Sequence, residues 1–497
     1  MKNTIIIMLT ALLWISCSDD EKVNIKPVAA FKTSEVTIEE GQHVAFTDLS
    51  FDEDGQVTKW AWDFGNGVSS EEQLPTVEYT TAGEYTVTLS VWDNLGVQNA
   101  NTFNKTITVK EKSTADMAPE IVWEFQTPCG FQDVSPAIDD NGNVFVGCDA
   151  NNARGGQNIW VINGGIEVWH YSSGDVIRSS AAIADNGTAY IGSYDKNLYA
   201  FAAHSSDPLG KFDLGATAKF SCPAIDKDGT VYFSANRKLF AIHAAPGMTE
   251  KWNVDCEGVT QSTPVIGNDA VYMCSNSGKL YALAKTDGAK KWTLEYGKTC
   301  TSVPAIGEDG TIYLCGETAD GGIVMAVNPD GTVRWQQKSA ATFPNSGISL
   351  SIDGQLYVGN SDGDMLCYSQ ESGDLIWKFR TQGQIRSVPA IDNDGNIYFG
   401  DGKGYFYVLS SKGKLSYKEI QLGANIWSSP VIDKNGIIYI CADVTKSSEP
   451  GKVYALRTHA TGAQQGWSMR SGDYRRSARK QLSLIHISEP TRQAEIS

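Results

Sequence analysis

The stretch Ser135-Pro136-Ala137-Ile138-Asp139, with Gly142 and Val144-Phe145 after it, is the first of eight copies of one motif. A period near 40 residues with several short strands in each unit is typical of a β-propeller. We therefore predict an all-β chain with an eight-bladed propeller over residues 120–481. The anchor positions equivalent to Pro136 lie 40 to 45 residues apart at Ala181, Pro223, Pro264, Pro304, Ile348, Pro389 and Pro430.

Each repeat contains four strand-like stretches, which is the content of one propeller blade. The third and fourth stretches of one repeat, Ala282 to Trp292, resemble the tryptophan-docking motif of PQQ-like propellers (quinoprotein dehydrogenase-like), except that Ala284 stands where Asp is expected. The resemblance implies that the Trp packs between neighbouring blades. Trp123 precedes the first copy and Trp467 follows the last, so we expect one of these two segments to complete the last blade and close the ring. Residues 466–476 also resemble the closing segment of these propellers.

Ahead of the propeller, residues 26–111 alternate apolar and polar side chains in short runs, as in Glu84 to Val91. This period of two predicts an immunoglobulin-like β-sandwich. The stretches 62–67 and 79–87 resemble the PKD domain family, which implies a spacer or a contact module for proteins or glycans. Three aspartates, Asp52, Asp54 and Asp93, have the chemistry of a Ca²⁺ site. Such residues more often serve ordinary loop turns, and we predict no metal.

The N-terminus reads as a targeting segment. Lys2 precedes an apolar run that is too short to span a bilayer. Residues 1–17 resemble a bacterial lipoprotein signal in which Cys17 becomes the lipidated residue, and residues 18–25 form an acidic tether. Lipidation of Cys17 would anchor the protein to a membrane. A polar linker covers residues 112–119. Residues 482–497 resemble a translated sequencing-library adapter and are left out of the predicted fold.

The charge of the chain excludes one class of partner. Its formal net charge is −17 and its pI is near 4.8. Binding to nucleic acid needs a basic face, so we predict no nucleic-acid partner. Beyond Cys17 there are nine cysteines, and Cys148, Cys274, Cys315 and Cys441 fall at or beside the end of the second strand of a repeat. We interpret these four as small buried residues.

Aligning the repeats predicts a ring of side chains near the propeller axis. Two residues before each anchor, seven of the eight copies carry Ser. The position before that varies in type, as a binding site would, and it mixes Arg, Asp and aromatic residues. Such a set could bind an anionic or sugar-like ligand by forked hydrogen bonds and stacking; the alternative is a solvated channel mouth without a ligand. The candidate ligand ring is Asp133, Arg178, Phe220, Gln261, Thr301, Asn345, Arg386 and Trp427.

The sequence favours binding over catalysis. No two cysteines are adjacent, whereas PQQ-dependent dehydrogenases carry a disulfide between adjacent cysteines, and the tight repeat spacing leaves no room for their inserted loops. We predict no cofactor and no enzyme activity. The predicted protein is a lipid-anchored lipoprotein of the bacterial outer membrane, exposed at the cell surface or at the periplasmic face. Its partner is a glycan or a protein, with an assembly scaffold for outer-membrane barrels and a PQQ-dependent dehydrogenase as alternatives.

Overall fold

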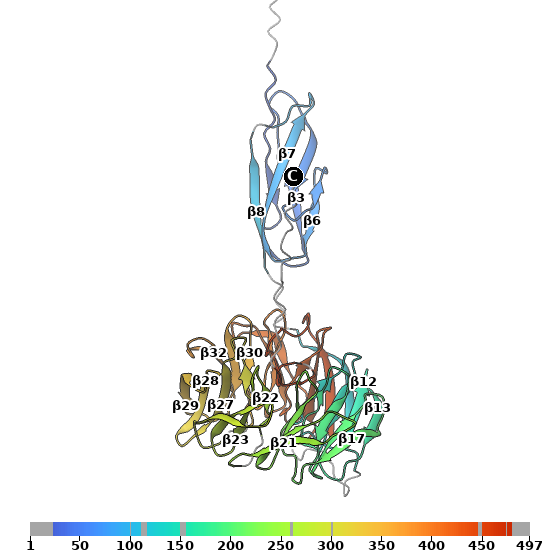
Figure 1. The fold of residues 1–497 in the computed structure, drawn as a ribbon. Coiled ribbons are helices and arrows are strands. Elements are labelled where there is room, and N and C mark those ends of the chain that lie inside the picture. Colours follow the sequence, from blue (N-terminus) through green and yellow to red (C-terminus); the bar gives the residue numbers. More distant parts are fainter. Residues whose placement is uncertain are drawn as a thin grey trace, which may run out of the picture. The chain divides into compact units, whose positions relative to one another are not determined.

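The structure is a computed structural model that describes residues 23–99, 101–110, 117–149, 156–258, 262–299, 302–445, 450–473 and 475–479. The chain divides into two compact units, residues 1–113 and 114–497 (Figure 1). Residues 1–17 with Cys17, most of the acidic tether and the tail 482–497 lie outside the described residues. Within the described part, no helix is long and apolar enough to cross a bilayer.

The first unit is a β-sandwich of a three-stranded sheet, β1-β3-β6, and a five-stranded sheet, β2-β8-β7-β4-β5 (Figure 1). The alternation noted in the sequence places Val87, Leu89 and Val91 of β7 in the core, where they pack with Trp62 and Phe31. Because both sheets contribute apolar faces to this core, the predicted sandwich is confirmed. Its strands are β1 Phe31–Thr33, β2 Thr37–Glu39, β3 Gln42–Asp48, β4 Val57–Asp63, β5 Ser69–Ser70, β6 Thr76–Tyr79, β7 Gly83–Asp93 and β8 Phe103–Lys110.

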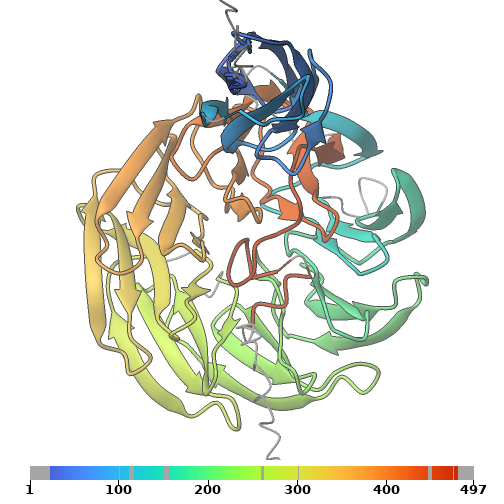
Figure 2. The same ribbon diagram turned by 90° about the horizontal axis from the view of Figure 1, so that it is seen from above.

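The second unit is a β-propeller, and its described residues form eight four-stranded antiparallel sheets around a centre (Figure 2). The two-residue first strand of each sheet is the Ala-Ile part of the motif or its equivalent and is fully buried. First strands of neighbouring sheets contact one another, which places them innermost. The first four sheets are β10 Ala137–Ile138, β11 Val144–Gly147, β12 Ile159–Asn163, β13 Ile166–Tyr171; β14 Ala182–Ile183, β15 Ala189–Gly192, β16 Asn197–Phe201, β17 Pro208–Asp213; β18 Ala224–Ile225, β19 Val231–Ala235, β20 Lys238–Ile242, β21 Glu250–Asp255; and β22 Val265–Ile266, β23 Ala270–Ser275, β24 Lys279–Ala284, β25 Lys290–Glu295.

The remaining four sheets repeat this pattern, with one exception in the last. They are β26 Ala305–Ile306, β27 Ile312–Thr318, β28 Gly321–Val327, β29 Val333–Ser339; β30 Ser349–Leu350, β31 Gln355–Gly359, β32 Asp364–Ser369, β33 Leu375–Arg380; β34 Ala390–Ile391, β35 Ile397–Gly400, β36 Tyr405–Leu409, β37 Leu415–Gln421; and β38 Val431–Ile432, β39 Ile437–Asp443, β40 Gly451–Arg457, β9 Glu120–Thr127.

The exception is the strand that closes the ring. The outer strand of the last sheet is β9, from the start of the unit, and it pairs with β40 from the end, with Trp123 opposite Ala455. Of the two segments considered from the sequence, the one with Trp123 therefore completes the last blade. The segment with Trp467 forms no outer strand and runs instead across the inner strands.

In several sheets, a tryptophan on the outer strand forms a hydrogen bond to the next sheet. The indole Nε1 of Trp335 donates to the carbonyl oxygen of Gln370 on the next sheet at 2.8 Å, and Trp377 does the same to Ser411. The glycine of the docking motif lies against the tryptophan of the preceding sheet. A Cβ on Gly373 would meet the ring of Trp335 at 2.6 Å, in a backbone conformation with φ of 75°. The motif thus acts as an inter-blade joint.

The end of each second strand requires a small residue. A Cβ on Gly400 would lie 2.1 Å from Cγ2 of Ile426 in the neighbouring sheet, and Gly359 faces Ile385 in the same way. Cys274, Cys315 and Cys441 are buried thiols at equivalent positions, as interpreted from the sequence. Cys148 departs from that interpretation because it forms a disulfide with Cys129 at the end of β9, over a separation of 19 residues.

Candidate functional site

The predicted ligand ring lies in the loops that lead into the innermost strands. Three of its members, Asp133, Phe220 and Asn345, have φ values of 58°, 59° and 50°. Left-handed backbone in a residue other than glycine costs free energy and concentrates at functional positions. In such turns the side chain points away from the strand direction, so side chains from distant sheets can meet.

Two ring members from separate sheets contact each other directly. The side-chain amide of Asn345 donates to the carboxylate of Asp133 at 3.2 Å, although the two residues are 212 positions apart. Asp133 is 8% exposed, and its burial raises the pKa of this carboxyl, while the charges of Arg386 and Arg470 oppose that rise. The contact brings these two ring positions together.

A second pair forms the wall of a cavity. The guanidinium of Arg386 lies over the indole of Trp427, with its Cζ 4.4 Å from the ring centroid. Arg386 Nε has no hydrogen-bond acceptor among the described residues. The cavity beside this pair has a volume of about 420 Å³. Its lining is Gln132, Asp133, Arg386, Gly402, Lys403, Ala424, Asn425 and Trp427.

Other ring members do not line this cavity. Arg178 is held by Asp149 through two hydrogen bonds of 3.2 and 3.0 Å, and it stacks over Tyr194 at 5.3 Å. Phe220 is half-buried and lies outside the cavity lining. Gln261 and Thr301 fall outside the described residues.

The serines that stand two residues before the anchors are fully buried. They are small, and they also form hydrogen bonds. Ser302 donates to the carbonyl of Cys315, and Ser428 accepts from the backbone N–H of Cys441 at the end of the second strand of its own sheet. One residue further along, the backbone N–H of Ser429 in the last sheet donates to the hydroxyl of Ser135 in the first. This bond closes the ring of sheets at the channel.

The C-terminal residues 464–473 and 475–479 run across the inner strands at the centre of the propeller (Figure 2). Their backbone carbonyls accept from inner-strand N–H groups of several sheets, as Trp467 does from Leu350 and Ser477 does from Ile225. Arg476 is fully buried and donates to the carbonyls of Pro136, Arg470 and Ser429. Burial, with repulsion from Arg470, lowers the pKa of Arg476 to about 9.

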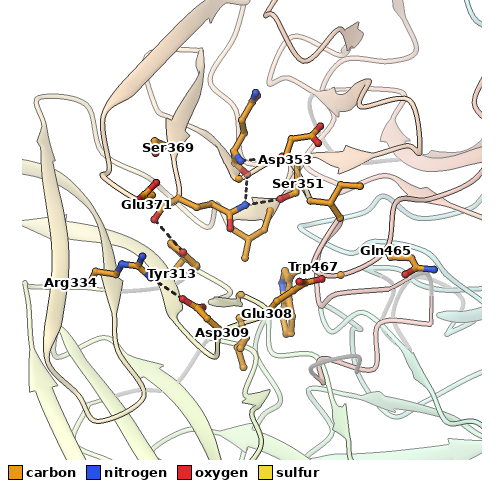
Figure 3. A pocket seen from close by; sticks show the side chains of 18 of the residues that line it. Glu308, Asp309, Tyr313, Arg334, Ser351, Asp353, Ser369, Glu371, Gln465 and Trp467 are labelled. Atoms are coloured by element: carbon orange, nitrogen blue, oxygen red, sulfur yellow. Dashed lines mark hydrogen bonds and ion pairs between the residues drawn. The ribbon is translucent and has the colours of Figure 1, made fainter. Parts of the chain in front are cut away.

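A larger cavity, of about 600 Å³, lies between the fifth and sixth sheets and the C-terminal segment (Figure 3). Ile352 and Ile376 line it and are 63% and 51% exposed. Trp467 contributes a buried indole whose Nε1 has no partner among the described residues. We call this cavity the apolar groove. Its rim is acidic, with exposed carboxylates on Glu308, Asp309, Asp353 and Glu371 and one cation, Arg334, bound to Asp309 at 2.8 Å.

The described residues contain no group of three or more His, Cys, Asp and Glu side chains placed to hold a metal. In the first unit, Asp93 instead accepts hydrogen bonds from the backbone of Leu95 and Val97 and from the side chain of Asn24. Asp54 accepts from the backbone of Ile25. Asp93 thus serves the turn that follows β7, and Asp54 ties its loop to Ile25.

Sequence reasoning missed several residues of the channel. Lys403 and Asn425 line the small cavity, but they lie in loops whose positions vary between repeats. Arg470 belongs to an irregular segment without periodicity. The one available signal was the resemblance of residues 466–476 to a closing segment, which does not tell where the side chains point.

Two family models match the chain. A PKD domain model matches residues 24–109, and a model described as outer membrane protein assembly factor BamB matches residues 150–349 and 320–429. The first unit is similar to part of the pre-pro-metalloprotease PrtV of Vibrio cholerae, with 44% identity over 86 residues, 17% of this chain and 9% of that protein.

The propeller is similar to the assembly factor BamB of Moranella endobia, with 26% identity over 182 residues, 34% of this chain and 46% of that protein. This chain thus spans less than half the length of each of these two relatives. Among solved structures, that of BamB from Moraxella catarrhalis aligns with a TM-score of 0.55 and 17% identity, over 68% of this chain and all of that one. At this identity the structural likeness supports the propeller fold alone.

Proposed function

The chain belongs to the family described as outer membrane protein assembly factor BamB, and from this premise we propose that it is a non-enzymatic scaffold of the bacterial envelope. The family model covers more than half of the 497 residues. The proposed role is to bind a protein partner in assembly at the outer membrane. Lipidation of Cys17 would hold the scaffold at the membrane surface.

The observation that carries this proposal is the apolar groove. Large apolar side chains rimmed by polar ones mark protein interaction sites. Ile352 and Ile376 are exposed beside the acidic rim, and the buried indole N–H of Trp467 has no acceptor among the residues that the structure describes. The complementary partner is a segment with apolar and basic side chains, which fit the isoleucines and the acidic rim.

The test is co-purification from envelopes of the native host. Replacing Ile352 and Ile376 together by Glu adds charge to the apolar floor, so we expect at least a tenfold loss of the co-purified partner. The matched control is Ile166→Glu, which changes an isoleucine that is 73% exposed on β13, outside the groove. Retention of the partner by the double variant, or equal loss in the control, would refute the groove as the binding site.

A further inference from the structure

We propose that the cavity at the channel mouth binds an acidic saccharide. Arg386 and Lys403 bind its carboxylate, and Asp133 and Asn425 accept hydrogen bonds from its hydroxyl groups. The site shares no lining residue with the apolar groove, so it does not depend on the proposed scaffold function.

Positive charge gathers at this cavity although the whole chain is acidic. The chain has a net charge of −17, yet two of the cavity-lining residues, Arg386 and Lys403, are cations. A third cation, Arg470, is 5% exposed, has Nε without a partner among the described residues, and acts electrostatically on Asp133. Asp133 is the one carboxylate among the lining residues. The mouth therefore carries an excess of positive charge, which favours an anionic ligand.

The cavity is also lined by hydrogen-bond acceptors. Asn425 is 7% exposed and lines the cavity, and its Oδ1 has no donor among the described residues. A buried acceptor without a donor is destabilising, and Asp133 adds a second acceptor. An anion without hydroxyl groups has only acceptors and gives Asn425 Oδ1 no donor. A sugar supplies hydroxyl donors and, when acidic, also the carboxylate that the cations require.

The size and shape of the cavity suit a small ligand. A volume of about 420 Å³ lies within the range of small-molecule sites, roughly 300–1,000 Å³. Trp427 offers an apolar surface between the polar groups. Its ring is fixed by the stacked Arg386 and by Gly402, where a Cβ would meet Cη2 of the indole at 2.5 Å. The platform is thus rigid before a ligand arrives, which lowers the cost of binding.

Calorimetric titration of the whole purified protein tests the proposal with three probes: digalacturonate, neutral galactobiose and inorganic phosphate. We expect saturable binding of digalacturonate and at least tenfold weaker binding of the other two. Equal binding of galactobiose would show that the carboxylate of the ligand does not contribute, which contradicts the proposal. Equal binding of phosphate would reduce the site to a simple anion site, and no binding of digalacturonate would overturn the proposal.

Variants assign the binding to this cavity. Arg386→Gln should weaken digalacturonate binding at least tenfold. Lys403→Gln changes an exposed loop residue that the fold does not need, and should weaken binding three- to tenfold with an unchanged melting temperature. Arg237→Gln removes the same charge from a side chain that is 54% exposed on another loop, and should bind as the wild type does. Unchanged affinity in both Arg386→Gln and Lys403→Gln would contradict the assignment.

Discussion

The guanidinium of Arg386 and the indole of Trp427 stack at 4.4 Å, although they come from loops of two successive sheets. Cation–π contacts of this kind contribute about 0.5–2 kcal/mol, depending on how far they are withdrawn from water. The stack presents the cation at the edge of the cavity in a fixed orientation. Each of the two residues therefore depends on the other for its position at the cavity wall.

The stack leads to a prediction about salt. The proposed carboxylate contact is electrostatic and lies at a partly open mouth, where added ions screen it; the Debye length falls from about 10 Å at 0.1 M to about 3 Å at 1 M. Raising NaCl from 0.05 to 0.5 M should weaken digalacturonate binding several-fold, as measured by calorimetry. In Arg386→Gln the same change should have a clearly smaller effect. A salt response that is the same in both proteins would argue against Arg386 as the carboxylate ligand.

A second prediction concerns the inter-blade contact at the end of the second strand. Gly400→Ala places a methyl group 2.1 Å from Cγ2 of Ile426 in a buried joint. Overpacking of this kind costs about 1–3 kcal/mol, so the urea midpoint of the propeller should fall. Gly247→Ala is the control, since a Cβ there has no neighbour within 4 Å. Equal midpoints for the two variants would show that the neighbouring sheets adjust freely.

A third prediction concerns the closing strand. The Cys129–Cys148 disulfide ties the end of β9 to the first sheet across 19 residues. Cross-links over loops of this length stabilise by about 3 kcal/mol, mainly through the unfolded state. Replacing both cysteines by Ser should lower stability by that order in urea unfolding. Cys256→Ser, which removes a buried thiol outside the disulfide, serves as the comparison. A reductant should lower the urea midpoint of this variant as it lowers that of the wild type, and it should leave the midpoint of the double Ser variant unchanged.

A fourth prediction concerns pH and the C-terminal segment. Asp185 accepts from Arg479 at 2.6 and 2.8 Å and from Arg475 at 3.0 Å, and the hydrogen bond from Arg479 is the main reason that the pKa of Asp185 lies below its ordinary value of 3.8. A carboxyl with a lowered pKa in the folded state contributes stability above its unfolded pKa, and this contribution is lost as the pH falls through the folded pKa.

Asp185→Asn should therefore be less stable than the wild type at pH 7. The loss should stay below about 1 kcal/mol because the carboxylate is 56% exposed. The difference between the two proteins should persist down to about pH 4 and shrink below it, as measured by urea unfolding at several pH values. A difference that grows toward acid pH would have the wrong sign for this linkage.

The repeats made the propeller predictable because each sheet is built from local contacts that recur with the same residue types. Each Ala-Ile inner strand marks one blade in the sequence, and so does each docking tryptophan, such as Trp335. The closing strand was left open between Trp123 and Trp467 because the pairing of β9 with β40 joins residues more than 300 positions apart. No local pattern encodes such a contact.

The candidate site was predictable only in part, for a related reason. The repeat alignment placed Asp133, Asn345, Arg386 and Trp427 at equivalent positions, and the structure brings them to one end of the channel. It could not tell that Arg178 would be engaged by Asp149. Arg470 approaches from a segment that forms no strand, so periodicity carried no information about it.

The central claim is that the apolar groove binds a partner protein in the envelope. Its most direct test is photocross-linking in living cells of the native host, with benzoylphenylalanine placed at position 352 and, as a control, at position 166. We expect position 352 to cross-link to a protein of outer-membrane barrel assembly and position 166 not to. Absence of a protein cross-link at position 352, or the same product from position 166, would contradict the claim.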